Sequence, residues 1–426
     1  MKMLSVGGRL TLVKSVLGSM PIFYMSMFKA PAGILKSLES MRSHFLNGHD
    51  SASGKVIWLS WKKVITPRDK GGLGVASLFA LNRGLMFKWV WRFLNQGSSL
   101  WARVIKAIHG IDGNIGRVPR DGYNSCWSNI VKEVKYLSEK GIDLMKYLCI
   151  RVGNGGKTSL WEDIWRVDGR LRDKFPRIYA LESCKSITIG DKLAQPSLQF
   201  SFRRMPRGGV EQEQYELFVQ EMQQIILTSL EDRWSWCLNG SGEYTVASVR
   251  SLIDDTLCMD YGQRTRWNEF VPIKVNTHVW KVMTNSLATR FNLSRRGIDI
   301  ASISCGTCDQ GVETVSHLFF RCDMAQQVRR LINRWWMVPD LVTESFEDWR
   351  IWVSNIRMGS KTKKMFEGVY YVAWWLLWMF RNKKLFEVKG PSKATFFDDV
   401  VSRSFYGVVV GAKSSSLGTT SLRIGT

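Results

Sequence analysis

Long apolar runs are missing from this 426-residue sequence. The best candidate for a membrane segment, residues 368–380 (GVYYVAWWLLWMF), is uncharged for only thirteen residues, whereas a spanning helix needs about 20. A second apolar run at 16–28 follows Arg9 and Lys14, but no clear small-residue cleavage site comes after it. We therefore expect no transmembrane helix and no signal peptide, and we predict a nuclear or cytoplasmic location.

Acidic side chains are also in short supply. Asp and Glu together number 37 against 60 Lys and Arg, which gives a net charge of +23 and an isoelectric point near 9.8. The excess is spread along the chain, and it predicts a polyanionic partner such as RNA or DNA. Nineteen tryptophans support this prediction because aromatic rings stack on unpaired bases, although their helical spacing places most of them in the core. A generally basic protein without such a partner remains the alternative.

Cysteine and histidine are scarce, yet four of them gather in the stretch CGTCDQGVETVSHLFFRC at 305–322. The four are Cys305, Cys308, His317 and Cys322. Three thiols and one imidazole at this spacing are the donor set of a closed tetrahedral zinc site. Because four protein ligands leave no open coordination position, we predict one structural Zn²⁺ that takes no part in catalysis.

The residues around these ligands indicate how the site is built. Gly306 lies between the first two cysteines, and its backbone freedom should let the loop wrap one side of the metal. Residues 313–334 carry a helical apolar pattern, so His317 and Cys322 are expected to reach the metal from the start of a helix. Four unrelated buried residues would be the alternative, since free cysteine is common in cores. Clustering within eighteen residues favours zinc.

The other cysteines show no comparable spacing. They are Cys126, Cys149, Cys184, Cys237 and Cys258. We interpret them as core residues and expect no disulfide framework, which fits a reducing compartment.

Helical periodicity dominates the chain, and the predicted fold class is mainly α with small β-hairpins. Apolar spacing predicts helices at 78–93 and 211–230. An alternating strand followed by a glycine-rich turn is expected at 56–75. Glycine-centred turns predict β-hairpins at 151–166 and 234–246.

Two short motifs imitate functional sites and are better explained structurally. GNGGKTS at 153–159 resembles a phosphate-binding loop, but that motif needs a glycine where Arg151 stands. The pair Asp398 and Asp399 follows two phenylalanines, as in the metal-binding box of polymerase palms. It lies in a predicted helix at 393–406, where carboxylates in the first turn favour the helix dipole. We therefore expect neither a nucleotide loop nor a catalytic metal pair.

Several ordered segments together resemble the C-terminal half of plant LINE-type (non-LTR) retrotransposon reverse transcriptases. The similar segments are 4–31 (LSVGGRLTLVKSVLGSMPIFYMSMFKAP), 55–75, 81–93, 151–165 (RVGNGGKTSLWEDIW), 267–298, 374–386 (WWLLWMFRNKKLF) and 402–407 (SRSFYG). The zinc ligands fall where the ligands of that family fall. The resemblance covers nearly the whole chain, and the order of its motifs makes it specific.

The resemblance implies a division of the chain. The expected parts are a thumb-like helical region at 1–110, a connecting region with a β-hairpin at 111–205, a reverse-transcriptase-type zinc-binding domain at 211–345, C-terminal helices at 346–410 and a disordered tail at 411–426. The palm of the family, with its catalytic acidic box, would lie upstream of Met1. We therefore expect a truncated member of the RNA-directed DNA polymerase family that has no catalytic residues and is inactive alone.

The remaining part is expected to bind RNA or DNA, with no membrane and no small-molecule substrate. The predicted phosphate contacts are Arg9, Lys14, Lys62, Lys63, Lys281, Arg290, Arg295, Arg296, Arg329, Arg330 and Arg334. A zinc-stabilised protein–protein adaptor is the alternative. A metal-dependent nuclease using Asp398 and Asp399 is less favoured, because no histidine or further acidic set stands near them.

Overall fold

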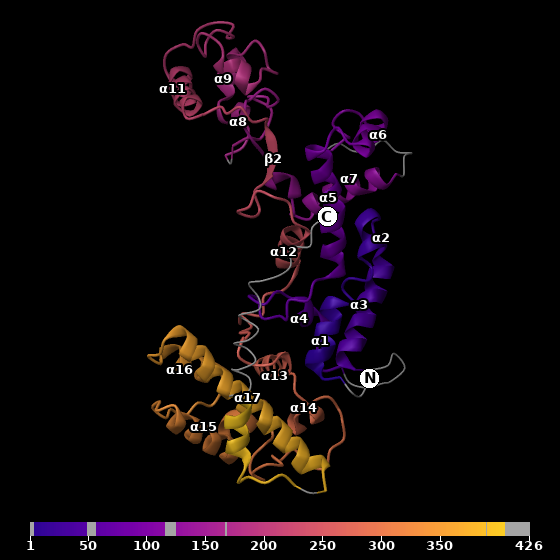
Figure 1. Ribbon diagram of the computed structural model, residues 1–426, viewed down its shortest axis with the longest axis vertical. Coiled ribbons are helices and arrows are strands. Elements are labelled where there is room, and N and C mark those ends of the chain that lie inside the picture. Colours follow the sequence, from indigo (N-terminus) through magenta and orange to yellow (C-terminus); the bar gives the residue numbers. More distant parts are fainter. Residues whose placement is uncertain (1–3, 49–56, 116–124, 167, 389, 405–426) are drawn as a thin grey trace. The chain divides into compact units, whose positions relative to one another are not determined.

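The structure is a computed structural model, and it describes residues 4–48, 57–115, 125–166, 168–388 and 390–404. The chain forms two compact units, and Figure 1 follows their elements along the sequence. Unit 1 comprises residues 1–19, 37–75 and 258–426, and unit 2 comprises 20–36 and 76–257. The predicted tail at 411–426 lies outside the described residues. The mainly helical fold class is confirmed.

Unit 2 holds the middle of the chain. Its helices are α2 (Ile22–Met27), α5 (Leu78–Asn95), α6 (Leu100–His109), α7 (Cys126–Glu139), η1 (Leu144–Tyr147), α8 (Leu171–Lys174), α9 (Pro176–Leu181), α10 (Ile189–Leu193), α11 (Val210–Gln223) and α12 (Val246–Leu257). Helix α3 (Ala32–Asn47) begins in this unit and ends in unit 1. The predicted helix at 78–93 is confirmed, and the one predicted at 211–230 ends earlier, at Gln223.

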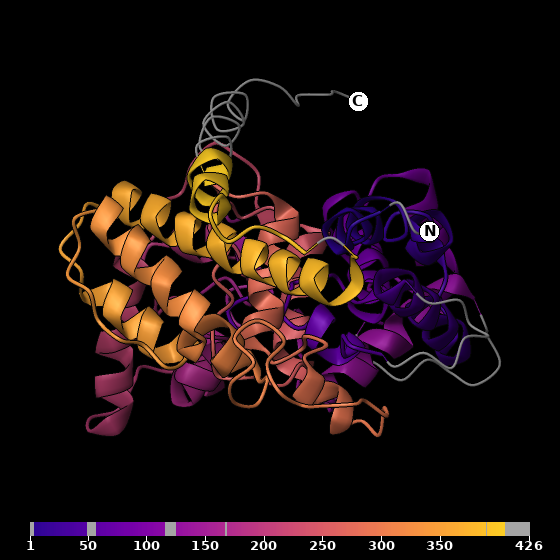
Figure 2. The ribbon, with the colours of Figure 1, turned by 90° about the horizontal axis from the view of Figure 1, so that it is seen from below.

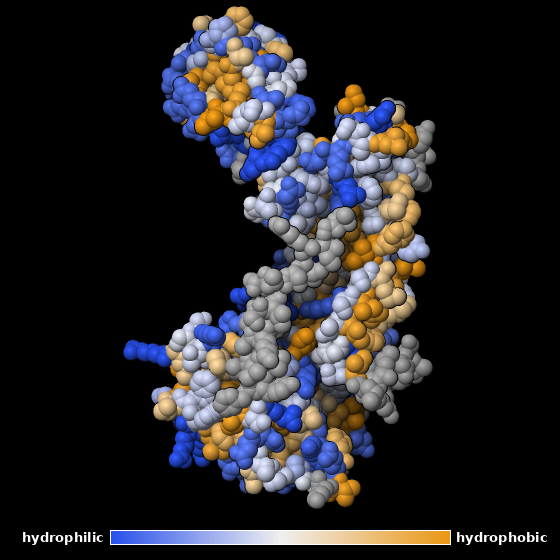
Figure 3. Space-filling model, viewed as in Figure 1, coloured by the Kyte–Doolittle hydropathy of each residue, from blue (hydrophilic) through white to orange (hydrophobic). Residues whose placement is uncertain are grey.

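Local capping explains where the central helix of unit 2 begins. The Ser77 hydroxyl accepts a hydrogen bond from the Ala80 amide at 3.0 Å, which satisfies one free N–H of the first turn of α5. The same hydroxyl donates to Asp254 of α12 at 2.7 Å. One serine therefore starts α5 and joins it to α12, which packs along it. Figure 3 shows hydrophobic surface over α2, and Phe23 is one of the exposed apolar residues of this helix.

The strands of unit 2 come from distant parts of the sequence. β1 (Leu148–Arg151) pairs antiparallel with β2 (Arg233–Trp236), with Leu148 opposite Trp236. The local hairpin predicted at 151–166 is therefore wrong. The turn predicted within 234–246 is present, but it closes only a single antiparallel bridge between Trp236 and Gly242. A strand was also expected at 56–75, but the structure forms helix α4 (Trp61–Ile65) there.

The cysteines beside this sheet correct another expectation. Cys149 and Cys237 form a disulfide between residues 88 positions apart. Cys126 and Cys184 are exposed rather than buried in a core. Spacing could not reveal the pair because strand pairing, and not sequence proximity, brings Cys149 and Cys237 together.

Unit 1 combines the N-terminal segments with the C-terminal third of the chain. Its helices are α1 (Val6–Ser15), α4, α13 (Ile273–Met283), α14 (Arg290–Ser294), η2 (His317–Arg321), α15 (Asp323–Trp335), α16 (Phe346–Asn355) and α17 (Ser360–Phe386). Helices α1 and α13 cross closely at Gly7, which has no side chain. A Cβ at this position would lie 2.7 Å from the Lys274 backbone. Trp280 of α13 is buried and donates to the Gly71 carbonyl at 3.0 Å.

Helix α17 is the largest element of unit 1, and Figure 2 shows it as the long yellow-orange helix. It packs against α13 and α15. Its apolar centre is buried in an aromatic cluster in which Trp374 lies 4.7 Å, between ring centroids, from Trp349 of α16. Within the described ranges, no helix combines the length and apolar character needed to cross a bilayer. The interpretation of 368–380 as a core helix is confirmed.

Candidate metal centre

The loop at 305–311 forms the first half of the predicted metal site. The Cys305 amide donates to the Gly311 carbonyl at 2.9 Å, and the Asp309 amide donates back to the Cys305 carbonyl at 2.8 Å. Positive φ angles of 60° at Asp309 and 69° at Gly311 allow the tight reversal. These bonds turn the chain so that Cys305 and Cys308 face the same point.

Gly306 has a different role from the one expected. Its φ is not positive, so the turn does not depend on glycine's backbone freedom at this position. A Cβ there would instead lie 2.8 Å from Leu385 Cδ2 of α17. Gly306 therefore provides space for α17 against the loop.

The second half of the site is a single π-helical turn. The Cys322 amide donates to the His317 carbonyl at 2.7 Å, an i to i+5 hydrogen bond. In a regular α-helix these two side chains would point about 140° apart, whereas the wider π turn brings them to one side. Cys322 is extended and directly precedes α15. The continuous helix predicted over 313–334 is therefore interrupted at the metal ligands.

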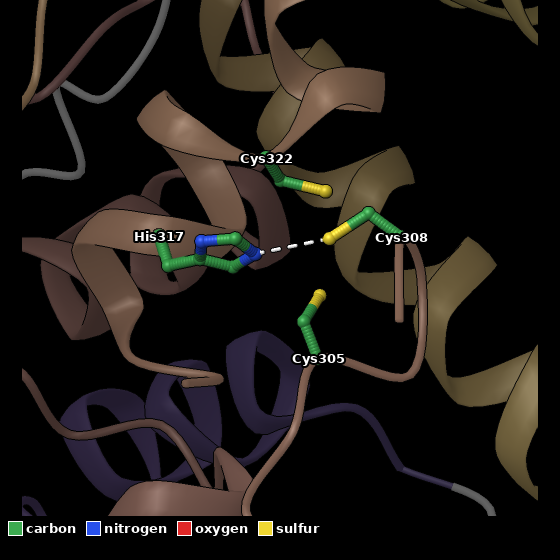
Figure 4. A group of neighbouring side chains, drawn as sticks. All are labelled: Cys305, Cys308, His317 and Cys322. Carbon is green, nitrogen blue, oxygen red and sulfur yellow. Dashed lines mark hydrogen bonds between the residues drawn. The ribbon is translucent and has the colours of Figure 1, made fainter. Parts of the chain in front are cut away.

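The four ligand atoms converge as zinc requires, as Figure 4 shows. All lie within 4.8 Å of one another, and Cys308 Sγ is 3.3 Å from His317 Nε2. Bonds of about 2.3 Å to sulfur in a tetrahedron place neighbouring sulfurs about 3.8 Å apart, so the donors fit Zn²⁺ with small adjustments. Cys305 and Cys322 are buried, and Cys308 and His317 are half-buried. In the part of the chain that the structure describes, no other group of His, Cys, Asp or Glu side chains converges in this way.

Two of the thiols interact directly, and their pKa values shift in opposite directions. A hydrogen bond from Cys322 lowers the pKa of Cys305 to about 4 despite its burial. The same bond, together with burial, raises the pKa of Cys322. A bound cation would favour the thiolate form of all three cysteines.

A buried ion pair fastens this loop to α17, and no local sequence pattern predicts it. Glu313 lies between the two halves of the site and is fully buried. Its Oε1 accepts from Arg381 Nη2 of α17 at 2.5 Å and from the Arg290 amide at 2.9 Å, and its Oε2 accepts from Arg381 Nε at 3.3 Å. Nearby, Lys384 donates to the Thr307 carbonyl at 3.3 Å. The metal loop and α17 are thus one packed structure.

All of the predicted phosphate contacts fall in unit 1. The exposed ones are Lys14, Lys62, Arg295, Arg296, Arg330 and Arg334; the half-buried ones are Arg9, Lys63, Lys281 and Arg290. The N-terminal residues and those of the metal region therefore belong to one compact unit, although more than 200 positions separate them in the sequence.

Several of these cations also make contacts within the protein. Arg9 Nε donates to the Leu46 carbonyl at 3.0 Å, and Lys14 Nζ donates to the Leu73 carbonyl at 2.9 Å. Arg290 Nη1 donates to the Ser304 carbonyl at 2.8 Å, directly before the first metal ligand. These three side chains therefore have a structural role whether or not they meet a phosphate.

Arg329 is the one predicted contact that the structure places in the core. Only 5% of the residue is exposed. Its guanidinium pairs with Asp340 and donates to the Leu341 carbonyl at 2.6 Å, which fixes the chain after α15. Arg329 and Arg330 are adjacent in the sequence, and both were predicted to contact phosphate. Adjacent residues point about 100° apart on a helix, so only Arg330 reaches the surface.

The two motifs set aside earlier have clear structural explanations. In the loop at 153–159, the amides of Gly153, Gly155 and Lys157 donate to the Asp232 carboxylate at 2.7, 2.9 and 3.0 Å. The amides that would bind a phosphate in a nucleotide loop are thus directed at a carboxylate of the protein itself. The helix carrying Asp398 and Asp399 begins at residue 396, so both lie in its first turn.

Comparisons with known proteins agree with the metal site. Residues 244–328, which include all four ligands, match the family described as zinc-binding in reverse transcriptase. A provisionally named ribonuclease H protein of Arabidopsis thaliana is 28% identical over 332 residues, which cover 75% of this chain and 51% of that protein. An uncharacterised mitochondrial protein of the same plant is 25% identical over 156 residues, which cover 35% of this chain and 94% of that protein. The chain thus spans about half the length of the first relative. The resemblance to the C-terminal region of plant non-LTR reverse transcriptases is confirmed, as is the prediction of one structural zinc.

Proposed function

We propose that this retroelement-derived chain, which carries a reverse-transcriptase-type zinc-binding domain, holds RNA or DNA through arginines that the zinc module keeps in place. The observation that supports this most directly is the state of Arg295, Arg296, Arg330 and Arg334. All four are exposed, and among the described residues none of them pairs with a carboxylate. An arginine without a carboxylate partner can pair with a phosphate without first breaking an ion pair.

The metal itself would be a poor anion site. Zinc with three thiolates and a neutral imidazole carries a net charge of −1, and its coordination is closed. The ion supplies folding energy, and the flanking side chains must supply the attraction to phosphates.

The fold positions three of these arginines. The Arg296 guanidinium lies 4.2 Å from the Trp58 ring centroid, and its Nη1 donates to the Ile57 carbonyl at 2.8 Å. Arg330 and Arg334 are four residues apart on α15, so they share the exposed face of that helix. Buried Val328 and Ile332 fix the opposite face, which directs both arginines to solvent.

A salt series on the zinc-loaded full chain tests the proposal. Binding of a labelled single-stranded RNA and of a DNA duplex is measured by fluorescence anisotropy at increasing NaCl for the wild type and for Arg330→Gln/Arg334→Gln. If both arginines contact duplex phosphates, the slope of log K against log salt should become shallower by about 1.8 in the variant, because each contact contributes about 0.9.

The matched control is Arg357→Gln/Lys361→Gln, which also removes two exposed charges four residues apart in unit 1. Its salt slope should stay close to that of the wild type. Binding that ignores salt, or equal losses in both variants, would refute the proposal. Salt-insensitive association with a protein would support the adaptor alternative instead.

A further inference from the structure

Unit 1 contains a cavity that the zinc site does not use. Its volume is about 420 Å³, within the range of roughly 300–1,000 Å³ that is usual for small-ligand pockets. Helices α1, α13 and α17 enclose it, together with Trp58 and the segment 286–288. All of these elements belong to unit 1, so the cavity is formed within one compact part of the chain.

A buried imidazole in the wall has an unused hydrogen-bonding atom. His278 of α13 lines the cavity and is 6% exposed. Burial, followed by the charge of Lys281, lowers its pKa to about 3, so the ring is neutral. One ring nitrogen bonds to the Trp374 backbone, and Nε2 has no partner among the described residues. Because Nε2 is the nitrogen without a partner, Nδ1 carries the proton to the carbonyl, and Nε2 is left as an acceptor.

The same wall carries positive charge. Lys274 and Lys281 of α13 both line the cavity. Burial and the neighbouring charge of Arg9 lower the pKa of Lys281 to about 8, so an anion in the cavity would stabilise its charged form. Residues 5–7 at the N-terminus of α1 also line the space, and the first turn of α1 has no acidic residue. The helix dipole therefore adds to the attraction for a negative group.

Aromatic rings complete the lining. Trp58, Trp375 and Trp378 are half-buried, so each presents part of its ring to the cavity. Lys274 Nζ lies 4.6 Å from the Trp375 ring centroid, and the His278 ring lies 6.1 Å from that of Trp378. A single space thus combines stacking surfaces, two ammonium groups and a hydrogen-bond acceptor.

We propose that this cavity receives one unpaired nucleotide of a bound strand, with its base against the tryptophans and its phosphate on Lys274 and Lys281. His278 Nε2 would accept a hydrogen bond from an amino group of the base or from a sugar hydroxyl. Stacking of a base on an aromatic ring contributes about 1–3 kcal/mol without demanding a particular base. This inference rests on the proposed function, since it names where one nucleotide of the bound nucleic acid goes.

The test uses the zinc-loaded full chain and two probes. Adenosine 5′-monophosphate reports on the cavity alone, by isothermal titration calorimetry, with inorganic phosphate as the comparison. Single-stranded RNA carrying one 2-aminopurine reports by anisotropy on overall binding and by fluorescence on the environment of the base. The variants are Ala288→Leu, which fills part of the cavity, and Lys281→Met, which removes a charge from its wall. Lys361→Met is the control, because Lys361 is exposed and outside the cavity.

We expect the mononucleotide to bind more tightly than phosphate, and both cavity variants to weaken it by about tenfold or more. The control should bind as the wild type does, and thermal melting should show that the variants remain folded. Equal mononucleotide affinity in the wild type and in Ala288→Leu would overturn the cavity assignment, as would RNA binding without mononucleotide binding, while the proposed function survives. Mononucleotide binding that Ala288→Leu abolishes, with no RNA or DNA binding at all, would show that the cavity binds a free nucleotide and would overturn both its place on a bound strand and the proposed function. Failure of both probes would overturn both.

Discussion

Replacing Glu313 by alanine should destabilise the zinc-binding region more than any change to an exposed ion pair. Glu313 is fully buried, and its partner Arg381 is 3% exposed. The substitution would leave the Arg381 guanidinium without its carboxylate and the Arg290 amide without its acceptor. Removing one partner of a buried pair typically costs about 3–5 kcal/mol, because the other charge remains buried and unpaired.

The chain offers a matched control in the same unit. Glu269 and Lys364 form an ion pair at 2.9 Å, but their side chains are 60% and 54% exposed. Breaking an exposed pair of this kind costs about 0–1 kcal/mol. Glu269→Ala should therefore shift stability by a small fraction of the Glu313→Ala effect.

Urea unfolding followed by near-UV circular dichroism measures the free energy of unfolding, and a chromogenic chelator measures zinc release under the same conditions. Glu313→Ala should unfold at lower urea and release zinc faster than Glu269→Ala. The double variant Glu313→Ala/Arg381→Met should recover part of the loss, because it removes the unpaired charge as well. Equal stability of the two single variants, within about 1 kcal/mol, would refute the argument that the buried pair fastens the loop to α17.

Three further outcomes are expected. Cys308→Ser, or a strong chelator, should release zinc and unfold the region around the metal loop, because binding free energy at such sites is largely folding free energy. Mass spectrometry measures the zinc content, and far-UV circular dichroism measures the loss of helix. An unchanged melting curve would exclude the zinc assignment. Gly7→Ala should cost about 1–3 kcal/mol in thermal or urea unfolding, because its Cβ would lie 2.7 Å from the Lys274 backbone, which cannot rotate away; a neutral effect would contradict the close crossing of α1 and α13. Asp232→Asn should reduce stability at neutral pH but not in acid. Burial alone would raise the pKa of the Asp232 carboxyl, but four hydrogen bonds outweigh it and lower the pKa. These come from Gly153, Thr158, Gly155 and Lys157. The contribution of Asp232 is thus present above the unfolded pKa of about 3.9 and is lost as pH falls through the folded pKa, so acid titrations of the two proteins should converge at low pH and diverge above it.

The zinc ligands could be predicted because their signal is local. Four residues within eighteen positions fix both the donor set and its coordination number, and no distant part of the chain is needed to recognise them. The backbone geometry that brings His317 and Cys322 together could not be predicted in the same way. A π turn differs from an α-helix by one residue per hydrogen bond, and the apolar pattern of 313–334 fits either, so the interruption at Cys322 left no trace in the periodicity.

The errors around β1 share a different cause, which is long-range pairing. The segment 151–166 has the glycine turn of a hairpin, yet its strand pairs with residues more than eighty positions away. The Asp232 carboxylate accepts from the amides of its glycine loop across a separation of 79 positions at Gly153. The Cys149–Cys237 disulfide follows from that pairing too. None of these contacts has a local signature, because each depends on which strand the fold brings alongside.

The zinc centre and the cavity are connected through α17. Near its C-terminus, this helix holds the metal loop through Arg381 and through the contact of Leu385 with Gly306. One to two turns earlier it presents Trp375 and Trp378 to the cavity. Because a helix moves as a rigid rod over such a distance, fixing its end against the metal loop also fixes the tryptophans. A closed metal site that does not contact the nucleotide can in this way still determine the position of the tryptophans on which the base stacks.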